Sequence, residues 1–171
     1  MMLSAVFFVP LLAGIYLSTG TNRRSQHANQ VSRDLASMYA QGVDFSQPAN
    51  QSIAHRLLDR RDGKTLLILT RVRMVTASDC AAAPAATCAN SGYPVMVQRI
   101  VIGDSDLRAS TLGTPLSIDR ATGNVLNWTT DLSARVTDPS VSLKPGETAY
   151  AAEAFISALD DQSGVYARTL F

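Results

Sequence analysis

The sequence has few of the residues from which nucleic-acid binders build their contact surfaces. Its 15 Lys and Arg residues against 14 Asp and Glu residues leave a formal net charge of only +1. Backbone phosphates require a clustered cationic surface, so we expect no nucleic-acid partner. Charged residues make up only 17% of the chain and hydrophobic residues 46%, which excludes disorder throughout because a core can form. A length of 171 residues allows one domain, or a small domain with an appendage.

The residues and motifs of common active sites are also scarce. His27 and His55 are the only histidines, and neither belongs to an HExxH pair that would bind zinc. The two cysteines lack the second pair of Cys or His ligands that a structural zinc site needs. The chain contains no GxSxG, GxxxxGK[ST] or GxGxxG motif. The sequence therefore predicts a non-catalytic protein with no metal, no cofactor and no small-molecule substrate.

The first twenty residues lack charged side chains altogether, since no Asp, Glu, Lys, Arg or His precedes Arg23. About 20 helical residues, at roughly 1.5 Å each, cross a hydrocarbon core of about 30 Å. We therefore expect a transmembrane segment over residues 1–21. A cleavable secretory signal and a buried core helix are the alternatives, and the basic start of a signal is missing. The expected span is formed by Leu3, Val6, Phe7, Phe8, Val9, Pro10, Leu11, Leu12, Ile15 and Leu17.

Two features disagree on which side of that membrane the rest of the chain lies. Arg23 and Arg24 follow the span directly, and positive residues normally stay on the cytoplasmic side. Cys80 and Cys88 flank a loop of small residues that could close as a disulfide in an oxidising compartment. Two unpaired thiols are the alternative. We expect the disulfide to form. We therefore expect a single-pass protein of the bacterial inner membrane, which contacts the membrane lipid. Its C-terminal domain is expected to be periplasmic or extracellular.

Residues 22–43 are polar but keep a helical period, which predicts an amphipathic helix that continues the span. Gly42 is a reasonable C-terminal stop. The apolar stripe of this helix could pack on the downstream domain, on a neighbouring subunit's helix, or on both. The stripe consists of Ala28, Val31, Leu35, Met38 and Tyr39.

Residues 44–171 predict an α+β domain with an antiparallel sheet. After a short helix over residues 53–60, apolar alternation and turn signals indicate strands in the order of the chain. A segment with many alanines near the end is ambiguous between helix and strand, and we favour strand because a Pro-Gly turn precedes it. The expected strands lie within residues 64–76, 94–104, 124–136, 147–159 and 164–171. The predicted fold class is thus α+β, with a long N-terminal helix, transmembrane in its first half, packed on a small antiparallel sheet.

Three stretches of the chain resemble one family in both content and order. They are AVFFVPLLAGIYL, RRSQHANQVSRDLASMYAQG and KPGETAYAAEAFIS. This arrangement is similar to pilins and pseudopilins, and specifically resembles the TadE and TadG-like family of tight-adherence pilus assembly proteins. Processed members of that family have a basic leader and a glutamate just before the apolar run. Here the corresponding position is Ser4 and the first acidic residue is Asp34, so either translation starts upstream or this copy is an unprocessed anchor.

The resemblance implies a membrane-anchored minor pilin-like subunit, or an assembly factor, of a tight-adherence pilus or secretion system. Its partners would be other pilus or secretion-system subunits. Two alternatives remain open: a membrane-anchored periplasmic hydrolase with an unrecognised site, and a soluble binding domain secreted after signal cleavage. An enzyme should show convergent polar groups with perturbed pKa values in a pocket, whereas an assembly subunit should show an exposed apolar helix face and no such pocket.

Overall fold

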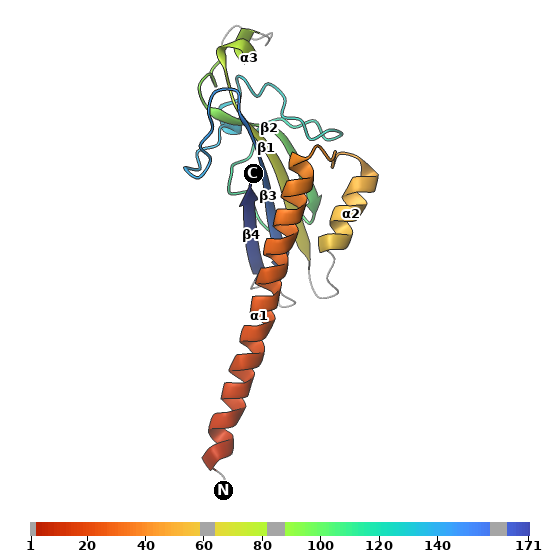
Figure 1. Ribbon diagram of the computed structural model, residues 1–171, viewed down its shortest axis with the longest axis vertical. Helices are drawn as coiled ribbons and strands as arrows, with labels where there is room; N and C mark the ends of the chain where they lie inside the picture. The colour runs from red at the N-terminus through yellow and green to blue at the C-terminus, as the bar shows by residue number, and fades with distance from the viewer. Residues whose placement is uncertain (1–2, 59–63, 82–87, 158–163) are drawn as a thin grey trace.

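The computed structural model describes the backbone of residues 3–58, 64–81, 88–157 and 164–171, and the side chains of its first helix from residue 22 onward. One long helix lies against a twisted antiparallel sheet, and a second, short helix lies beside it (Figure 1). The elements in chain order are α1 (Leu3–Ala40), α2 (Pro48–Leu58), β1 (Thr65–Met74), α3 (Ala77–Ala81), β2 (Pro94–Gly103), the 3₁₀ helix η1 (Leu132–Ala134), β3 (Thr148–Ser157) and β4 (Gly164–Leu170).

Four strands form the sheet in the order β2-β1-β3-β4, with every neighbouring pair antiparallel. β1 lies between β2 and β3, and its apolar run from Leu66 to Leu69 is buried, as expected for an inner strand covered on both faces. Leu69 is paired with Ile100 on one side and with Ala152 on the other. The segment that was ambiguous in sequence forms strand β3, because its alternating side chains are needed on both faces of the sheet.

The C-terminal half of α1 covers one face of this sheet. Leu35 and Ala36 are fully buried, and α1 is further fixed by Ser32, whose Oγ donates to the carbonyl of Ala152 at 2.9 Å. Gly42, with φ of +92°, ends the helix in the left-handed conformation that glycine adopts most easily. The core on this face consists of Val31, Leu35, Ala36, Tyr39, Phe45, Ala54, Leu58, Leu67, Leu69, Ile100, Ile102, Ala152 and Ala154.

The predicted transmembrane first half of α1 is corrected by the structure. Among the residues it describes, no helix is long and apolar enough to cross a membrane. The predicted fold class was therefore wrong in its membrane-spanning part, and so was the predicted single-pass inner-membrane localisation.

The opposite face of the sheet is covered by residues 104–147, which contain little regular structure. Val72, Met96 and Ala151 point to this face and pack with residues of the covering segment. The strand expected within residues 124–136 is not formed. In its place the structure has isolated bridges at Asn124 and Arg135 and the single turn of η1. The turn-forming residues of this segment allow contact with the sheet at points but not along a continuous ladder.

Candidate functional site

The expected apolar stripe of α1 lies on the protein's own sheet. Ala28, Val31, Leu35 and Tyr39 are buried, and Met38 is partly buried against the same core. Tyr39 additionally donates a hydrogen bond from its hydroxyl to Gln98 on β2 at 2.8 Å. Burial raises the pKa of Tyr39 well above its usual range, so this hydroxyl stays protonated. The stripe thus joins α1 to the domain.

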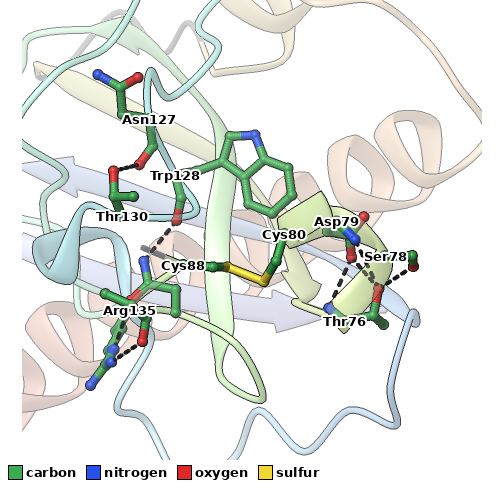
Figure 2. Close-up of a disulfide and its surroundings, with 11 residues drawn as sticks. Thr76, Ser78, Asp79, Cys80, Cys88, Asn127, Trp128, Thr130 and Arg135 are labelled. Atoms are coloured by element: carbon green, nitrogen blue, oxygen red, sulfur yellow. Dashed lines mark hydrogen bonds between the residues drawn. A yellow bond between two sulfur atoms is a disulfide. The ribbon is translucent and has the colours of Figure 1, made fainter. Parts of the chain in front are cut away.

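Cys80 and Cys88 are joined by a disulfide at the opposite end of the domain from the N-terminus. Cys80 belongs to α3, and Cys88 lies just before β2. The indole of Trp128 lies beside the sulfur bridge (Figure 2). Val75, Val95 and Val97 complete this small apolar cluster. The disulfide therefore ties α3 to the approach to β2 and fixes a wall against which the only tryptophan of the chain packs.

A buried amide holds the segment around Trp128 in place. The side-chain amide of Asn90, which is completely buried, donates to the carbonyls of Trp128 and Asp131, both at 2.7 Å. Its oxygen accepts a hydrogen bond from Nε of Arg135 at 2.8 Å. The guanidinium of Arg135 in turn stacks over the ring of Tyr93 at 3.8 Å. These contacts fix the position of the backbone that carries Trp128.

Between the end of α1 and this disulfide, the helix-side face of the sheet is open and hollow. The hollow has a volume of about 570 Å³. A second hollow of about 280 Å³ adjoins the first, because both are lined by Arg71, Asn124 and Tyr150. We call the two together the sheet groove. The groove is also lined by Arg73, Trp128 and Thr148 at the disulfide end and by Asp44 at the end of α1.

The two arginines of the groove differ in their partners. Arg73 forms an ion pair with Asp79 of α3, with 2.9 Å between Nη2 and Oδ1. Burial alone would raise the pKa of Asp79, but hydrogen bonds from Thr76 and the charge of Arg73 outweigh it, so the pKa is lowered. Arg71 is half-buried, and none of the ion pairs among the described residues includes it. Arg71 is thus the cation of the groove that has no carboxylate partner in the described part of the chain.

A different polar cluster lies on the opposite face, around the carboxylate of Glu153. This side chain belongs to β3 and is only 2% exposed, although it carries a carboxylate. It accepts hydrogen bonds from the hydroxyl of Ser110, from the amide and hydroxyl of Thr111 at 2.8 and 2.7 Å, and from the hydroxyl of Tyr166 at 2.7 Å. Burial would raise the pKa of Glu153, but these donors outweigh it and lower the pKa. Burial, with Glu153 nearby, raises the pKa of Tyr166 to about 12.

The Glu153 cluster connects the covering segment to the sheet. Ser110 and Thr111, which donate hydrogen bonds to Glu153, belong to the covering segment (residues 104–147), and the third donor, Tyr166, belongs to β4. Because every donor stabilises the ionised carboxylate, Glu153 is held as an acceptor and is not placed to take up a proton near neutral pH. Sequence reasoning missed this residue. The signal that could have indicated it is a single acidic side chain within the otherwise apolar alternation of β3.

The remaining candidates from the sequence are dispersed. His55 is exposed on α2, and His27 lies on α1. No group of three His, Cys, Asp or Glu side chains that could hold a metal ion is found within the described ranges. On α2, Ile53 and Leu57 leave 42% and 36% of their surface exposed, one helical turn apart. Such an exposed apolar face is the feature expected of a subunit that contacts another protein.

Comparison with known proteins gives no independent guide to this arrangement. No protein-family model, no curated protein and no solved structure matches the chain.

Proposed function

We propose that the chain is a non-catalytic, pilin-like subunit or assembly factor of a tight-adherence pilus or a related secretion system. Its function is to bind other subunits. The observation that supports this proposal best is the division of α1 into two parts. The C-terminal part, from Ala28 to Tyr39, packs on the sheet, while the N-terminal part extends beyond the end of the sheet (Figure 1).

Helix α1 is much longer than the sheet that it covers. At about 1.5 Å per residue, a helix of 38 residues is roughly 57 Å long, whereas a strand of 10 residues spans only about 33 Å. A helix that is not supported by tertiary packing has little stability of its own, because most helical stability in proteins comes from packing of an apolar face. The extended part of α1 is therefore the element to which a partner helix would contribute most.

The exposed apolar pair on α2 supports a second contact with a subunit. Ile53 and Leu57 lie on the same face of α2, while Ala54 and Leu58 of the same helix are buried against the core. The buried apolar residues of this short helix cover the core, and its exposed apolar residues can contact a neighbouring subunit. The three stretches that resemble the TadE and TadG-like family favour an assembly subunit over other binding proteins.

The proposal is tested in the cells that produce the protein. Deletion of its gene should reduce surface filaments, counted by electron microscopy, by at least about tenfold, and the wild-type gene should restore them. Complementation with the double variant Ile53→Ser and Leu57→Ser should restore them poorly. The matched control is Arg56→Ser, which changes an exposed polar residue on the same helix and should restore them fully. Unchanged filaments and unchanged secretion after deletion would exclude the assembly function.

A further inference from the structure

We propose that the sheet groove binds a carboxylate-bearing peptide segment of another protein, in which Arg71 pairs with the carboxylate and Trp128 and Tyr150 contact the neighbouring side chains. The groove lies between the C-terminal end of α1 and the disulfide, so it is remote from the extended part of α1. The inference therefore does not depend on the proposed assembly function.

Charge selects the ligand. Of the two arginines, Arg73 is already neutralised by Asp79, whereas Arg71 is half-buried and takes part in none of the ion pairs found within the described residues. A guanidinium offers a planar pair of donors that matches a carboxylate in a bidentate contact. Asp44, the one acidic residue among the described residues that line the groove, lies at its α1 end, where it accepts hydrogen bonds from Ser46. The ligand's carboxylate is therefore expected at the Arg71 position and away from Asp44.

The scarcity of acidic side chains along the described lining favours a peptide over a saccharide. Among the described residues that line the larger hollow there is no Asp or Glu, so these residues offer few strong acceptors for the many hydroxyl donors of a sugar. They offer donors instead, from Arg71, Asn124 and Thr148, which suit the carbonyls and carboxylates of a peptide. The rings of Trp128 and Tyr150 add the flat apolar area on which peptide side chains pack.

The groove is held open by the fold. The disulfide supports Trp128, and Asn90 fixes its backbone carbonyl. Tyr150 stacks edge-on against Tyr39 of α1, with 5.2 Å between ring centroids. Asn124 follows Gly123, whose carbonyl accepts a hydrogen bond from the amide of Arg99 on β2 at 2.7 Å. A site whose walls are already positioned loses little entropy when it binds a ligand.

The only tryptophan of the chain lines the groove, so its fluorescence reports binding directly. The full, disulfide-bonded protein would be titrated with three mixtures of acetylated, amidated pentapeptides, with Glu, Gln or Lys at the centre and uncharged amino acids elsewhere. We expect the Glu mixture to saturate the signal at a concentration about tenfold lower than the Gln mixture, as a charge-assisted contact implies. The Lys mixture should bind most weakly.

Variants identify Arg71 as the cause. Arg71→Gln should remove the preference for Glu over Gln, and Arg71→Lys should retain part of it because the charge stays while the bidentate geometry is lost. Arg56→Gln on α2 is the matched control and should behave as wild type. The preference is measured on the wild-type protein as well, so failure of a variant to fold does not remove the test. Equal affinities for the three mixtures, or no fluorescence response, would overturn the proposal. So would tighter binding of oligogalacturonate, a saccharide that carries carboxylates, than of the Glu mixture.

Discussion

The two faces of the sheet are covered in different ways, although they share the same four strands. On one face α1 and α2 pack mainly through apolar side chains such as Leu35 and Leu58. On the other face an irregular segment is attached to the sheet through the buried carboxylate of Glu153, and it is held together internally by half-buried polar groups such as Asp131. Asp131 accepts hydrogen bonds from the amides of Leu116 and Ser133 at 3.0 and 2.9 Å.

The difference shows what each kind of cover requires of the sequence. A helix satisfies its own backbone hydrogen bonds, so an apolar stripe is enough to place it on a sheet. A segment without regular structure leaves its amides and carbonyls to be satisfied singly, and each needs a polar partner at a specific position. We call the face covered by α1 and α2 the helical face and the face covered by residues 104–147 the irregular face. Substitutions that reduce side-chain volume should therefore destabilise the helical face most, and substitutions that remove a charge should destabilise the irregular face most.

The largest effect is expected from a cavity on the helical face. Leu35→Ala removes a completely buried side chain between α1 and the sheet and should lower the free energy of unfolding by about 3 kcal/mol. The control is Arg33→Ala, an exposed position on the same helix, which should change it by less than about 0.5 kcal/mol. Both are measured by urea denaturation. A loss below about 1 kcal/mol for Leu35→Ala would show that α1 is not firmly docked.

The disulfide should give the next largest effect, because it stabilises the part of the helical face that α1 does not reach. The double variant Cys80→Ser and Cys88→Ser should lose about 2.5 kcal/mol, mainly through the greater entropy of the unfolded chain. Alkylation followed by mass measurement under non-reducing conditions checks the bond itself. Equal melting temperatures for oxidised and reduced protein would indicate that the three valines around Trp128 hold this end without it.

The irregular face is tested by Glu153→Gln, which keeps the shape and removes the charge. We expect a loss of about 2 kcal/mol at neutral pH, since hydrogen bonds to a charged acceptor are the stronger ones. The lowered pKa of Glu153 also fixes the sign of the pH dependence. Its stabilisation is fully present above the unfolded pKa of about 4.3 and is lost as the pH falls through the folded value.

Denaturation curves at several acidic pH values therefore separate Glu153 from other groups. In the wild-type protein stability should fall as the pH decreases below about 5, and in the Gln variant this fall should be smaller. Glu147→Gln is the matched control, because Glu147 is the only other glutamate and is exposed. The same acid dependence in the Glu153 variant and the wild type would refute the assignment.

The smallest effect separates backbone strain from close packing. Gly123 has φ of +71°, and a Cβ added there would lie 2.7 Å from the carbonyl oxygen of Arg99. Gly42 has φ of +92° with open space around it. Both alanine variants suffer the left-handed conformation, but Gly123→Ala should lose about 1 kcal/mol more, since its methyl group must also displace a backbone. Equal losses would show that the segment beside β2 is free to move.

The sequence predicts the regular elements better than their arrangement. The alternation within residues 64–76 and 94–104 indicates β1 and β2, and Gly42 indicates the end of α1 within two residues. Nothing local indicates that β3 inserts beside β1, because that pairing joins residues about eighty positions apart. The expected short helix over residues 53–60 begins earlier, at Pro48, and its last two positions lie outside the described residues.

The sites were less predictable for a related reason. Arg71 and Arg73 were visible only as the polar half of an alternating strand, and the groove arises because α1 ends before it covers them. Glu153 is likewise explained by partners more than forty positions away, Ser110 and Thr111. The first part of α1 gives the opposite lesson. Its uncharged run predicted a membrane span, and that prediction was wrong because no such helix is found among the described residues.

The contact of the first helix with the last strand constrains the order in which the protein can mature during synthesis. The hydroxyls of Ser32 of α1 and Thr169 of β4 are hydrogen-bonded to each other at 2.8 Å, and Ala28 packs with Ala167. The docking site for α1 is thus completed only after β4 has left the ribosome. Until then the apolar side of the nascent helix has no finished surface to cover, which is the interval in which a chaperone would be most useful.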